Sequence, residues 1–480
     1  MKNNARLWNS PFASSLAPAE SVRLPEMLIG YLIGPFGAML ASGIFTSMLQ
    51  SYFTDVLKLD LGFLTALQLI STVLIVASNL VVGQLIERTH LLAGKARPWI
   101  LLSALLMSAA SLLMFVVPFR TPSGKMVWIA IAYNLYYAVA YPIYNTANAA
   151  LVPLSTRDSG KRSALASLVN MAGLATMGCG SMIFPVLVSF ALKEDPYRWF
   201  LAMLAVAVFT GLTVYLQFRF TRERVTEELA AGEEQQHHAQ PAPSIRIQLK
   251  TVASEKQWWI IMVFYLLFQW CGAIKNGSMV YFCKWDLANS TPDAWGAAQS
   301  FLAIAGAVPM VIAAAFVVPL ANRFTKRLVV FAGLAVGVLG GVIAALGGSR
   351  VIPVAVGVAI KCLGSAPAAY LILAMLADVI DHIEHKTGLR TDGLTMSIYS
   401  SIMVAATPVC NAIFSALLKL SGYNASADLS LGLAAQTEAV RGMIRVSYIW
   451  TETVAFALCA VLILFLKAEK TPQLHPDMPA

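Results

Sequence analysis

The sequence predicts an all-α membrane protein with twelve transmembrane helices. Of its 480 residues, 58% are hydrophobic and only 12% are charged, whereas a soluble protein carries about 25% charged residues. Apolar runs recur from one end of the chain to the other, and each reaches the roughly 20 residues that a helix needs to cross the bilayer. A soluble chain of this length would instead divide into two or three domains with polar surfaces.

The apolar runs locate the expected helices in order. The first begins just after Pro25, which closes a polar N-terminal segment. Because no cleavable signal peptide precedes this helix, we expect it to serve as the insertion signal. Polar or basic residues bound the other runs in the same way. The expected helices are 26–54, 61–87, 98–118, 125–154, 163–192, 198–218, 257–283, 292–320, 327–347, 351–384, 392–421 and 443–467.

The net charge of +9 reflects the orientation of the chain rather than a nucleic-acid partner. An even number of helices places both termini on one side of the membrane. Of the 34 Lys and Arg residues, 22 lie on that side, 10 on the other, and two, Lys275 and Lys361, within helices. Cytoplasmic loops carry the excess of Lys and Arg. Both termini are therefore expected in the cytoplasm, and no nucleic acid is expected as a partner.

The cysteines indicate neither a metal site nor a disulfide. All six lie within expected helices, without the spacing of metal ligands. We expect them to act as small packing residues. They are Cys179, Cys271, Cys283, Cys362, Cys410 and Cys459.

The longest polar interruption predicts two domains. It contains Glu233–His238 followed by Ala-Gln-Pro-Ala-Pro, a composition that cannot form a packed core. The histidines there could bind a metal, but a solvated linker is the simpler interpretation. We expect an N-terminal six-helix bundle over 1–218, a cytoplasmic linker over 219–256 and a C-terminal six-helix bundle over 257–480.

The two halves resemble each other after their second helices. Gly83–Arg88 is followed by a basic loop that ends at Arg97, and Pro319–Arg323 is followed by Lys326. Two sets of six helices joined by a cytoplasmic linker are similar to the major facilitator architecture, in which the substrate binds near the membrane midplane between the halves. Positive charge on cytoplasmic loops explains the similarity of the two hairpins equally well.

Charged residues are dense at the end of the tenth expected helix. Asp378 and Asp381 are three residues apart and share a helix face, and Glu384 continues that face to the cytoplasmic boundary. These carboxylates could pair with basic loops when the cytoplasmic side closes, or they could mark a helix end that simply reaches water. The residues expected in this cytoplasmic gate are Arg97, Arg162, Asp378, Asp381, Glu384 and Arg390.

The segment 375–393 resembles the signature of the glycoside–pentoside–hexuronide:cation symporters, the family that includes melibiose permease. Further segments resemble this family in order along nearly the whole chain. They are Thr54-Asp55-Val56, Gly94-Lys95-Ala96-Arg97-Pro98-Trp99, Asn145 to Pro153, Tyr281 to Trp285 and Gly422-Tyr423. The resemblance implies a major facilitator fold and a carrier of a sugar, glycoside, uronide or polyol that works by alternating access in the bacterial inner membrane.

The chain departs from this family where its sodium-using members bind the ion. Those members resemble one another in a pair of acidic residues on helix two and often a further acid on helix four. The corresponding positions here hold Ile75, Asn79 and Asn145, and the family's helix-five arginine corresponds to Asn170. The family's standard sodium site is therefore expected to be absent.

The interiors of the first six expected helices also lack carboxylates, because Asp55 and Glu87 lie at membrane boundaries. A charge at the membrane midplane costs at least about 2.5–3.5 kcal/mol, so carriers keep only the charges they need. We expect no cofactor, and either a coupling proton or uncoupled transport rather than sodium coupling.

Neutral hydrogen-bonding residues replace the missing charges in the first half. Tyr137, Tyr141, Tyr144 and Asn148 recur at helical spacing and form one stripe. Tyrosine beside asparagine suits a sugar, because it offers a flat apolar face with donors and acceptors at the rim. Hydrogen bonding between helices is an equally ordinary role for such residues. The substrate-binding candidates of this half are Gln50, Asn79, Tyr137, Tyr141, Tyr144, Asn145, Asn148 and Asn170.

The second half holds the charges that lie inside helices. Lys275, close to Trp270, could meet an anionic substrate such as a uronate or extend toward water. Lys361 has no acidic neighbour in the sequence. Glu452 could pair with either lysine or carry a coupling proton. Trp270, Lys275 and Lys361 are therefore candidates for substrate binding, and Glu452 is a candidate for coupling.

Other classes of function fit the sequence less well. The chain has no phosphate-binding loop and no His-Glu-x-x-His motif, which argues against an ATP-driven pump and against an enzyme. A channel would need a filter lined by charges or carbonyls, and none is visible. A larger amphipathic or lipid-like solute is the alternative substrate. The expected partners are a small-molecule solute and the lipid bilayer, and the protein is expected to be a monomer.

Overall fold

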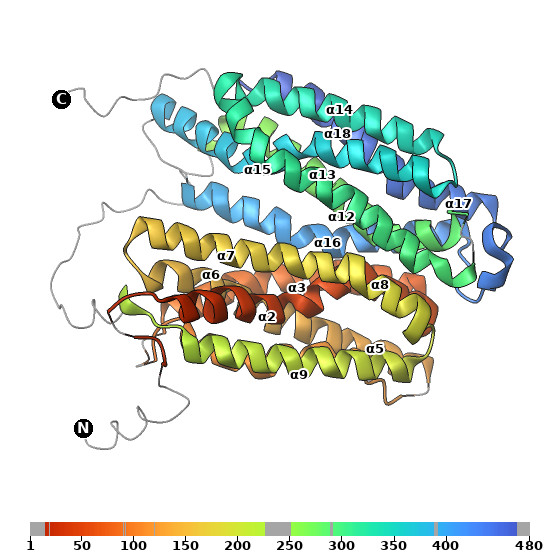
Figure 1. The fold of residues 1–480 in the computed structure, drawn as a ribbon, viewed down its shortest axis with the longest axis horizontal. Coiled ribbons are helices and arrows are strands. Elements are labelled where there is room, and N and C mark those ends of the chain that lie inside the picture. Colours follow the sequence, from red (N-terminus) through yellow and green to blue (C-terminus); the bar gives the residue numbers. More distant parts are fainter. Residues whose placement is uncertain are drawn as a thin grey trace. The chain divides into compact units, whose positions relative to one another are not determined.

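The computed structural model describes residues 15–225 except 19, 90, 92 and 120, residues 251–387 except 289 and 290, and residues 392–467. The regular elements of this part of the chain are all helical (Figure 1), and the β-type pairing it shows is an isolated bridge between Leu91 and Gly94. The prediction of an all-α protein is confirmed.

Eleven helical stretches among the described residues are long and apolar enough to cross a membrane. A further apolar helix, α4 (Arg97–Leu113), has only 17 residues. Its position is that of the third expected helix. The expected twelve helices therefore correspond to eleven long helices and one short one.

The chain divides into two compact units. The first contains the described residues up to 225 together with 411–420 and 424–426, and the second contains the other described residues. The elements of the first unit are η1 (Glu26–Ile33), α2 (Gly34–Ile44), η2 (Phe45–Leu49), η3 (Tyr52–Val56), α3 (Leu61–Glu87), α4 (Arg97–Leu113), α5 (Pro122–Asn134), η4 (Leu135–Ala140), α6 (Tyr141–Ser155), α7 (Ser159–Gly178), η5 (Cys179–Ile183), α8 (Phe184–Leu187), η6 (Val188–Leu192) and α9 (Pro196–Phe220).

The second unit begins at the helix that follows the undescribed residues 226–250. Its elements are α12 (Lys256–Trp285), η7 (Pro292–Ala294), α13 (Trp295–Arg323), α14 (Lys326–Leu346), α15 (Val351–Thr387), α16 (Asp392–Ser421, shared with the first unit), η8 (Leu429–Ala434), α17 (Glu438–Arg445), η9 (Val446–Trp450) and α18 (Thr451–Leu464). Most of the expected linker, 219–256, lies outside the described residues.

Short polar residues start several of these helices. The Asp60 side chain accepts a hydrogen bond from the Phe63 backbone at the start of α3, and Thr325 caps α14 in the same way. Such caps satisfy backbone N–H groups that have no partner within the helix. The cap residues mark the boundaries between loop and helix that the sequence predicts near 61 and 327.

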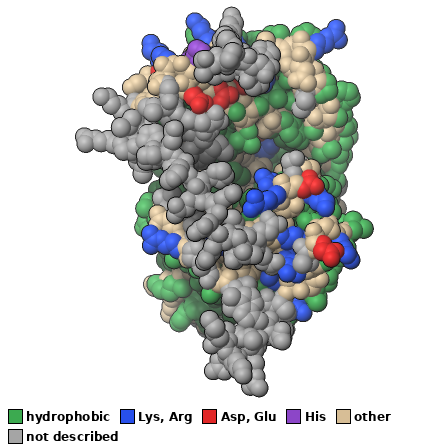
Figure 2. Space-filling model, turned by 90° about the vertical axis from the view of Figure 1, so that its left-hand side faces the viewer, with side chains coloured by type: hydrophobic (Ala, Val, Ile, Leu, Met, Phe, Trp, Pro, Cys, Tyr) green, Lys and Arg blue, Asp and Glu red, His purple; other side chains and the backbone are tan. Residues whose placement is uncertain are grey.

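The outward helix faces are apolar, as a lipid environment requires. Val73, Leu105, Leu346 and Ile352 each expose at least 70% of their surface. Figure 2 shows one face of the molecule, where Lys and Arg side chains gather, whereas hydrophobic side chains cover the flanks visible in this view. The distribution fits helices that cross a bilayer and end in charged surfaces.

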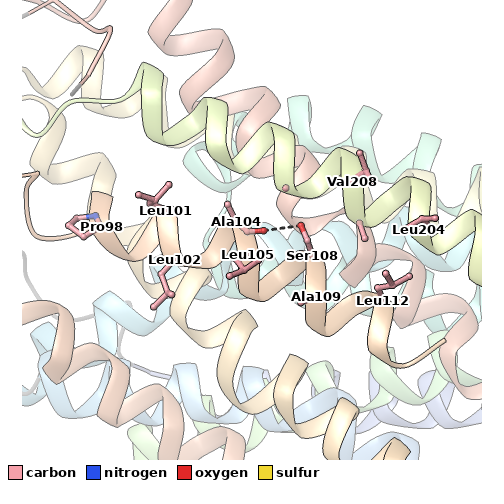
Figure 3. Close-up of a pocket in the computed structure, with 12 residues that line it drawn as sticks. Pro98, Leu101, Leu102, Ala104, Leu105, Ser108, Ala109, Leu112, Leu204 and Val208 are labelled. Atoms are coloured by element: carbon pink, nitrogen blue, oxygen red, sulfur yellow. Dashed lines mark hydrogen bonds between the residues drawn. The ribbon is translucent and has the colours of Figure 1, made fainter. Parts of the chain in front are cut away.

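A large hollow on the first unit is part of its apolar exterior. It lies between α4 and α9, has a volume of about 810 Å³, and is lined by residues such as Leu101, Leu105 and Val208 (Figure 3). Ser108 is its main polar side chain, and its hydroxyl donates to the Ala104 carbonyl. A surface without free polar groups does not suit a sugar, so this hollow is not the substrate site.

Candidate functional site

Three charged side chains from distant parts of the sequence meet inside the second unit. Lys275 of α12 lies with its Nζ 3.4 Å from Glu452 Oε1, and Lys361 of α15 lies with its Nζ 2.6 Å from Glu452 Oε2. Glu452 is the second residue of α18. We call these three residues the charge triad. The prediction that Glu452 could partner either lysine is resolved, because it contacts both.

The two lysines of the charge triad have different surroundings. The Lys361 side chain is fully buried and its Nζ lies over the Tyr448 ring, 5.6 Å from the centroid. Its close approach to Glu452 is an ion pair without the alignment of a hydrogen bond. The Lys275 side chain keeps 18% of its surface exposed. Lys275 is therefore the accessible member of the charge triad.

Close helix packing positions the buried lysine. A Cβ atom at Gly340 of α14 would overlap the backbone nitrogen of Lys361, so only glycine allows α14 and α15 to approach this closely. The π-helical turn η9 directly precedes α18, the helix of Glu452, and contains Tyr448. Such turns inside α-helices are frequent at functional sites.

The charge triad carries one more positive than negative charge. The charged groups that act on Glu452 are the two lysines, Lys275 and Lys361. Buried ions are stable only when they are compensated. Both lysines are compensated by the single Glu452 carboxylate.

Open space lies beside Lys275 on α12. A Cβ atom built at Gly272, one helical turn before Lys275, would meet no atom within 4 Å. Trp270, the neighbouring candidate, is partly exposed, and its buried indole N–H has no hydrogen-bond partner. Trp270 and Lys275 are five residues apart on α12, so their side chains leave the helix on different faces.

Two of the candidates on α6 bind to α9 instead of presenting free groups. The Tyr144 hydroxyl donates to Gln217 Oε1 at 2.9 Å, and Gln217 Nε2 donates to Asn148 Oδ1 at 2.8 Å. All three side chains are buried. Gln217 is not among the residues expected from the sequence, although a glutamine near the end of an apolar helix is a signal for such a hydrogen bond.

Other candidates of the first unit keep accessible surface. Tyr137, Tyr141 and Asn145 are partly exposed, and the Tyr137 ring packs 4.6 Å from that of Tyr133. Asn170 of α7 is exposed. The stripe on this helix therefore divides into an accessible part and a part that holds the bundle together.

Two further candidates of the first unit, Gln50 and Asn79, form hydrogen bonds with residues of the same unit. Gln50 accepts a hydrogen bond from Gln68 at 2.9 Å. The Asn79 amide donates to the Ile75 carbonyl one turn earlier. Asn79 is partly exposed, whereas Gln50 is buried.

The gate candidates lie at different places within the two units. Asp378 pairs with Lys326 at 2.6 Å in the second unit. Arg162 is exposed and donates to the Thr156 carbonyl. Asp381 is exposed and Glu384 partly exposed near the end of α15, where each has a charged or polar partner of its own. Arg390 lies outside the described residues.

Arg97, the remaining gate candidate, belongs to a turn that Glu223 organises. The Glu223 carboxylate accepts from the backbone N–H groups of Lys95, Ala96 and Arg97 at 2.7–2.8 Å. The Arg97 guanidinium lies 4.7 Å from the Phe218 ring centroid and donates to the Phe218 carbonyl. Glu223 was expected in the linker, 219–256, so this role is not visible in the sequence alone.

A second overlooked contact holds the start of the first helix. Arg224 pairs with Glu26 at 2.7 Å, and both side chains are almost fully buried. Arg224 also donates to the carbonyls of Pro18, Ser21 and Ser155. Glu26 is a further carboxylate of this half that the sequence-based expectation did not include. It lies at the start of the first helix, where Arg224 neutralises it, so it adds no charge to the helix interiors.

The described residues contain no group of three or more His, Cys, Asp or Glu side chains that could hold a metal ion. Asp55 is buried, and it accepts hydrogen bonds from the hydroxyls of Ser51 and Thr54. The charge triad remains the main cluster of ionisable groups inside the membrane-spanning part of the described chain.

Comparison with known proteins identifies the family. The model of the family described as "MFS/sugar transport protein" matches residues 30–470. The chain is 27% identical over 464 residues to the isoprimeverose transporter of Lactiplantibacillus pentosus, covering 93% of this chain and 90% of that protein. It is 23% identical over 404 residues to the glucuronide carrier protein homolog of Escherichia coli (strain K12), covering 83% and 84%.

Solved structures show the same fold. The nucleoside transporter NupG matches with a TM-score of 0.62 at 13% identity, covering 93% of this chain and 100% of that one. A bacterial homolog to the human lysosomal transporter Spinster, inward-facing and occupied, matches with a TM-score of 0.65 at 12% identity, covering 92% and 96%.

The fold and the family together define a secondary carrier of the major facilitator superfamily. The chain belongs to its sugar-transport family, and the expected kinship with the glycoside–pentoside–hexuronide symporters is confirmed. It is a multi-pass membrane transporter and not an enzyme.

Proposed function

We propose that this carrier moves a sugar or glycoside, in neutral or uronide form, by alternating access and without the standard sodium site of its family. The observation that supports this most directly is the distribution of charge. In the first unit the positions of the sodium ligands hold Ile75, Asn79 and Asn145, and the buried Glu26 is neutralised by Arg224. Sodium needs anionic oxygens, and these side chains offer none.

The substrate class follows from the relatives and from the side chains available. The relatives are named as carriers of isoprimeverose, glucuronides and lactose. The accessible rings of Tyr137 and Tyr141 with the Asn145 amide would bind a sugar face and its hydroxyls. We propose these residues as substrate contacts of the first unit and Trp270, Lys275 and Lys361 as substrate contacts of the second unit, with Glu452 as the candidate for coupling.

Reconstituted transport tests the proposal. Purified protein in liposomes is loaded with isoprimeverose, lactose or a β-glucuronide, and counterflow of the labelled sugar is measured with a sodium gradient, a proton gradient or neither. We expect saturable counterflow that a sodium gradient leaves unchanged within twofold. A saturable stimulation by sodium would contradict the absence of a sodium site, and no counterflow of any sugar would contradict the substrate class.

The orientation and the gate complete the proposal. We propose a monomer in the bacterial cytoplasmic membrane with both termini in the cytoplasm, supported by the excess of Lys and Arg on that side. We propose Arg97, Arg162, Asp381, Glu384 and Arg390 as residues of a cytoplasmic gate, since their charges lie at the ends of expected helices. Asp378 would contribute through its pair with Lys326, which fixes the end of α15 to the start of α14.

A further inference from the structure

We infer that the hollow between α4 and α9 is a binding site for an anionic glycerophospholipid of the cytoplasmic leaflet. An acyl chain of this lipid lies along the apolar hollow, and its phosphate binds to Lys95 and Arg219 at the cytoplasmic end. The site lies within the first unit, on its apolar exterior, and is separate from the transport site proposed above.

The first support is the length of the hollow. It has a volume of about 810 Å³, with Pro98 at one end and Leu112 and Leu204 at the other (Figure 3). From Pro98 to Leu112 the helix α4 rises by about 21 Å, at about 1.5 Å per residue. One leaflet fills about 15 Å of the hydrocarbon core. The hollow is therefore long enough for an acyl chain to lie along it.

A close contact between two small residues shapes the hollow. A Cβ atom at Gly211 of α9 would lie 2.8 Å from the Ser108 hydroxyl of α4, so the two helices nearly touch at this point. Leu105 and Val208 line the same hollow and expose 71% and 64% of their surface. A lipid chain in the hollow thus packs against apolar side chains of both helices.

The second support is the position of two basic residues where the hollow ends. The start of α4 meets the end of α9 there, since the Arg97 guanidinium donates to the Phe218 carbonyl at 3.1 Å. Arg219 directly follows Phe218, and the Lys95 backbone N–H donates to Glu223 at 2.7 Å. The side chains of Lys95 and Arg219 are both partly exposed. A phosphate at this end of the hollow would therefore lie close to two cations.

Basic residues also outnumber acidic ones at this end. The segments 94–97 and 218–225 contain five Lys or Arg residues and a single acidic residue, Glu223. The Glu223 carboxylate accepts from three backbone N–H groups, and Arg224 is compensated by Glu26. The other four basic residues leave a positive surplus. Basic pockets between transmembrane helices on the cytoplasmic side bind the headgroups of anionic lipids.

The third support is that the face of α9 that lines the hollow leads to Arg219. Val208, which lines the hollow, precedes Tyr215 by seven residues and Arg219 by eleven. These intervals are close to two and three turns of an α-helix, so the three side chains leave the helix on one face. Tyr215 is partly exposed, and tyrosine is enriched at the level of the lipid headgroups. The apolar and the basic part of the site are therefore continuous along one helix.

Two lipids with the same acyl chains test the inference. Delipidated protein in detergent is titrated with dioleoylphosphatidylglycerol, which is anionic, or with dioleoylphosphatidylcholine, which has no net charge. Bound lipid is measured by native mass spectrometry. We expect the wild-type protein to bind the anionic lipid at least about tenfold more tightly, which is about 1.4 kcal/mol. Equal binding of the two lipids would overturn the inference.

Variants assign the headgroup and the chain to their residues. We expect Lys95→Gln with Arg219→Gln to reduce the preference to within twofold. The charge-matched control, Arg157→Gln with Lys161→Gln, removes two exposed charges near the start of α7 and should retain the preference. Ala109→Phe, at an exposed position in the hollow, should weaken the binding of both lipids, whereas Ala77→Phe at an exposed position of α3 should not. Each variant is first checked for a monodisperse profile in detergent.

The remaining outcomes decide each part of the site. An unchanged preference in the Lys95 and Arg219 double variant would overturn the headgroup site, and unchanged binding by Ala109→Phe would overturn the chain site. Glycerophosphoglycerol, the same headgroup without acyl chains, should bind far more weakly than the lipid, and equally tight binding would also overturn the role of the hollow. Lipid binding is measured without any sugar, so these results are independent of the proposed function, which sugar counterflow tests.

Discussion

Glu452 joins two lysines of different helices inside the second unit. Its carboxylate faces two lysine ammonium groups, at 3.4 and 2.6 Å, and it exposes almost no surface. Removing one partner of a buried ion pair typically costs about 3–5 kcal/mol, because the other charge stays buried and uncompensated. Replacing both partners by neutral groups is far less costly.

The residue-scale prediction follows from this asymmetry. We expect Glu452→Gln to destabilise the protein by about 3–5 kcal/mol, since the fully buried Lys361 then faces a neutral amide. The double variant Glu452→Gln with Lys361→Met should recover most of this loss. Thermal inactivation in detergent measures both effects, and a double variant less stable than Glu452→Gln alone would contradict the uncompensated charge as the cause.

At the scale of elements, glycine residues determine how closely neighbouring helices pack. Helix association in membranes depends on close packing of small residues. At Gly340 a side chain would overlap the backbone of α15 at Lys361. The position of one member of the charge triad is therefore set by the α14–α15 contact.

The element-scale prediction concerns this contact. We expect Gly340→Val to separate α14 from α15, to lower the melting temperature, and to cost at least about 1–3 kcal/mol, the range for overpacking. We expect this variant also to lose binding of the transported sugar, because Lys361 is displaced. Gly173→Val on α7, where a Cβ meets nothing within 4 Å, is the control and should melt close to wild type. Equal melting temperatures for the two variants would show that the α14–α15 contact at Gly340 does not determine the stability of the protein.

The turn before α4 shows how an element is held by a residue outside it. Gly94 has a φ of +110°, a backbone conformation that residues other than glycine rarely adopt. The turn presents three backbone N–H groups to Glu223, beyond the end of α9. A carboxylate at the first turn of a helix also interacts favourably with the helix dipole. Glu223 thereby fixes the start of the short helix α4.

At the scale of the whole molecule, the distribution of basic residues predicts its orientation. We expect tags on both termini to be accessible from the cytoplasm and protected from outside, because 22 of the 34 Lys and Arg residues lie on the side of the termini. Protease protection in spheroplasts with an epitope at each end measures this. Epitopes on opposite faces would contradict both the orientation and the even number of crossings.

The fold was largely predictable from the sequence, because hydropathy is a local property. The expected ranges near 61–87, 257–283 and 327–347 correspond to α3, α12 and α14 within a few residues at each end. The short α4 differs from expectation at its end, since the helix stops at Leu113 while the apolar run continues to Pro118. Hydropathy reports which residues avoid water, and it does not report where the helical hydrogen bonds stop.

The candidate site was predictable only in part. The spacing of Tyr137, Tyr141, Tyr144 and Asn148 correctly places them on one helix, but spacing does not say which neighbour each side chain meets. The structure shows Tyr144 and Asn148 bonded to Gln217. The contacts of Glu223 and Arg224 were missed because charged residues after an apolar helix normally indicate a solvated loop.

The sequence by itself determined that this chain crosses the membrane repeatedly, that it is related to sugar symporters, and that its intramembrane charges lie in the second half. Only the tertiary structure decided that Lys275, Lys361 and Glu452 meet. The physical reason is that transfer to lipid depends on composition along each helix, whereas an ion pair depends on how three helices are rotated and packed against one another.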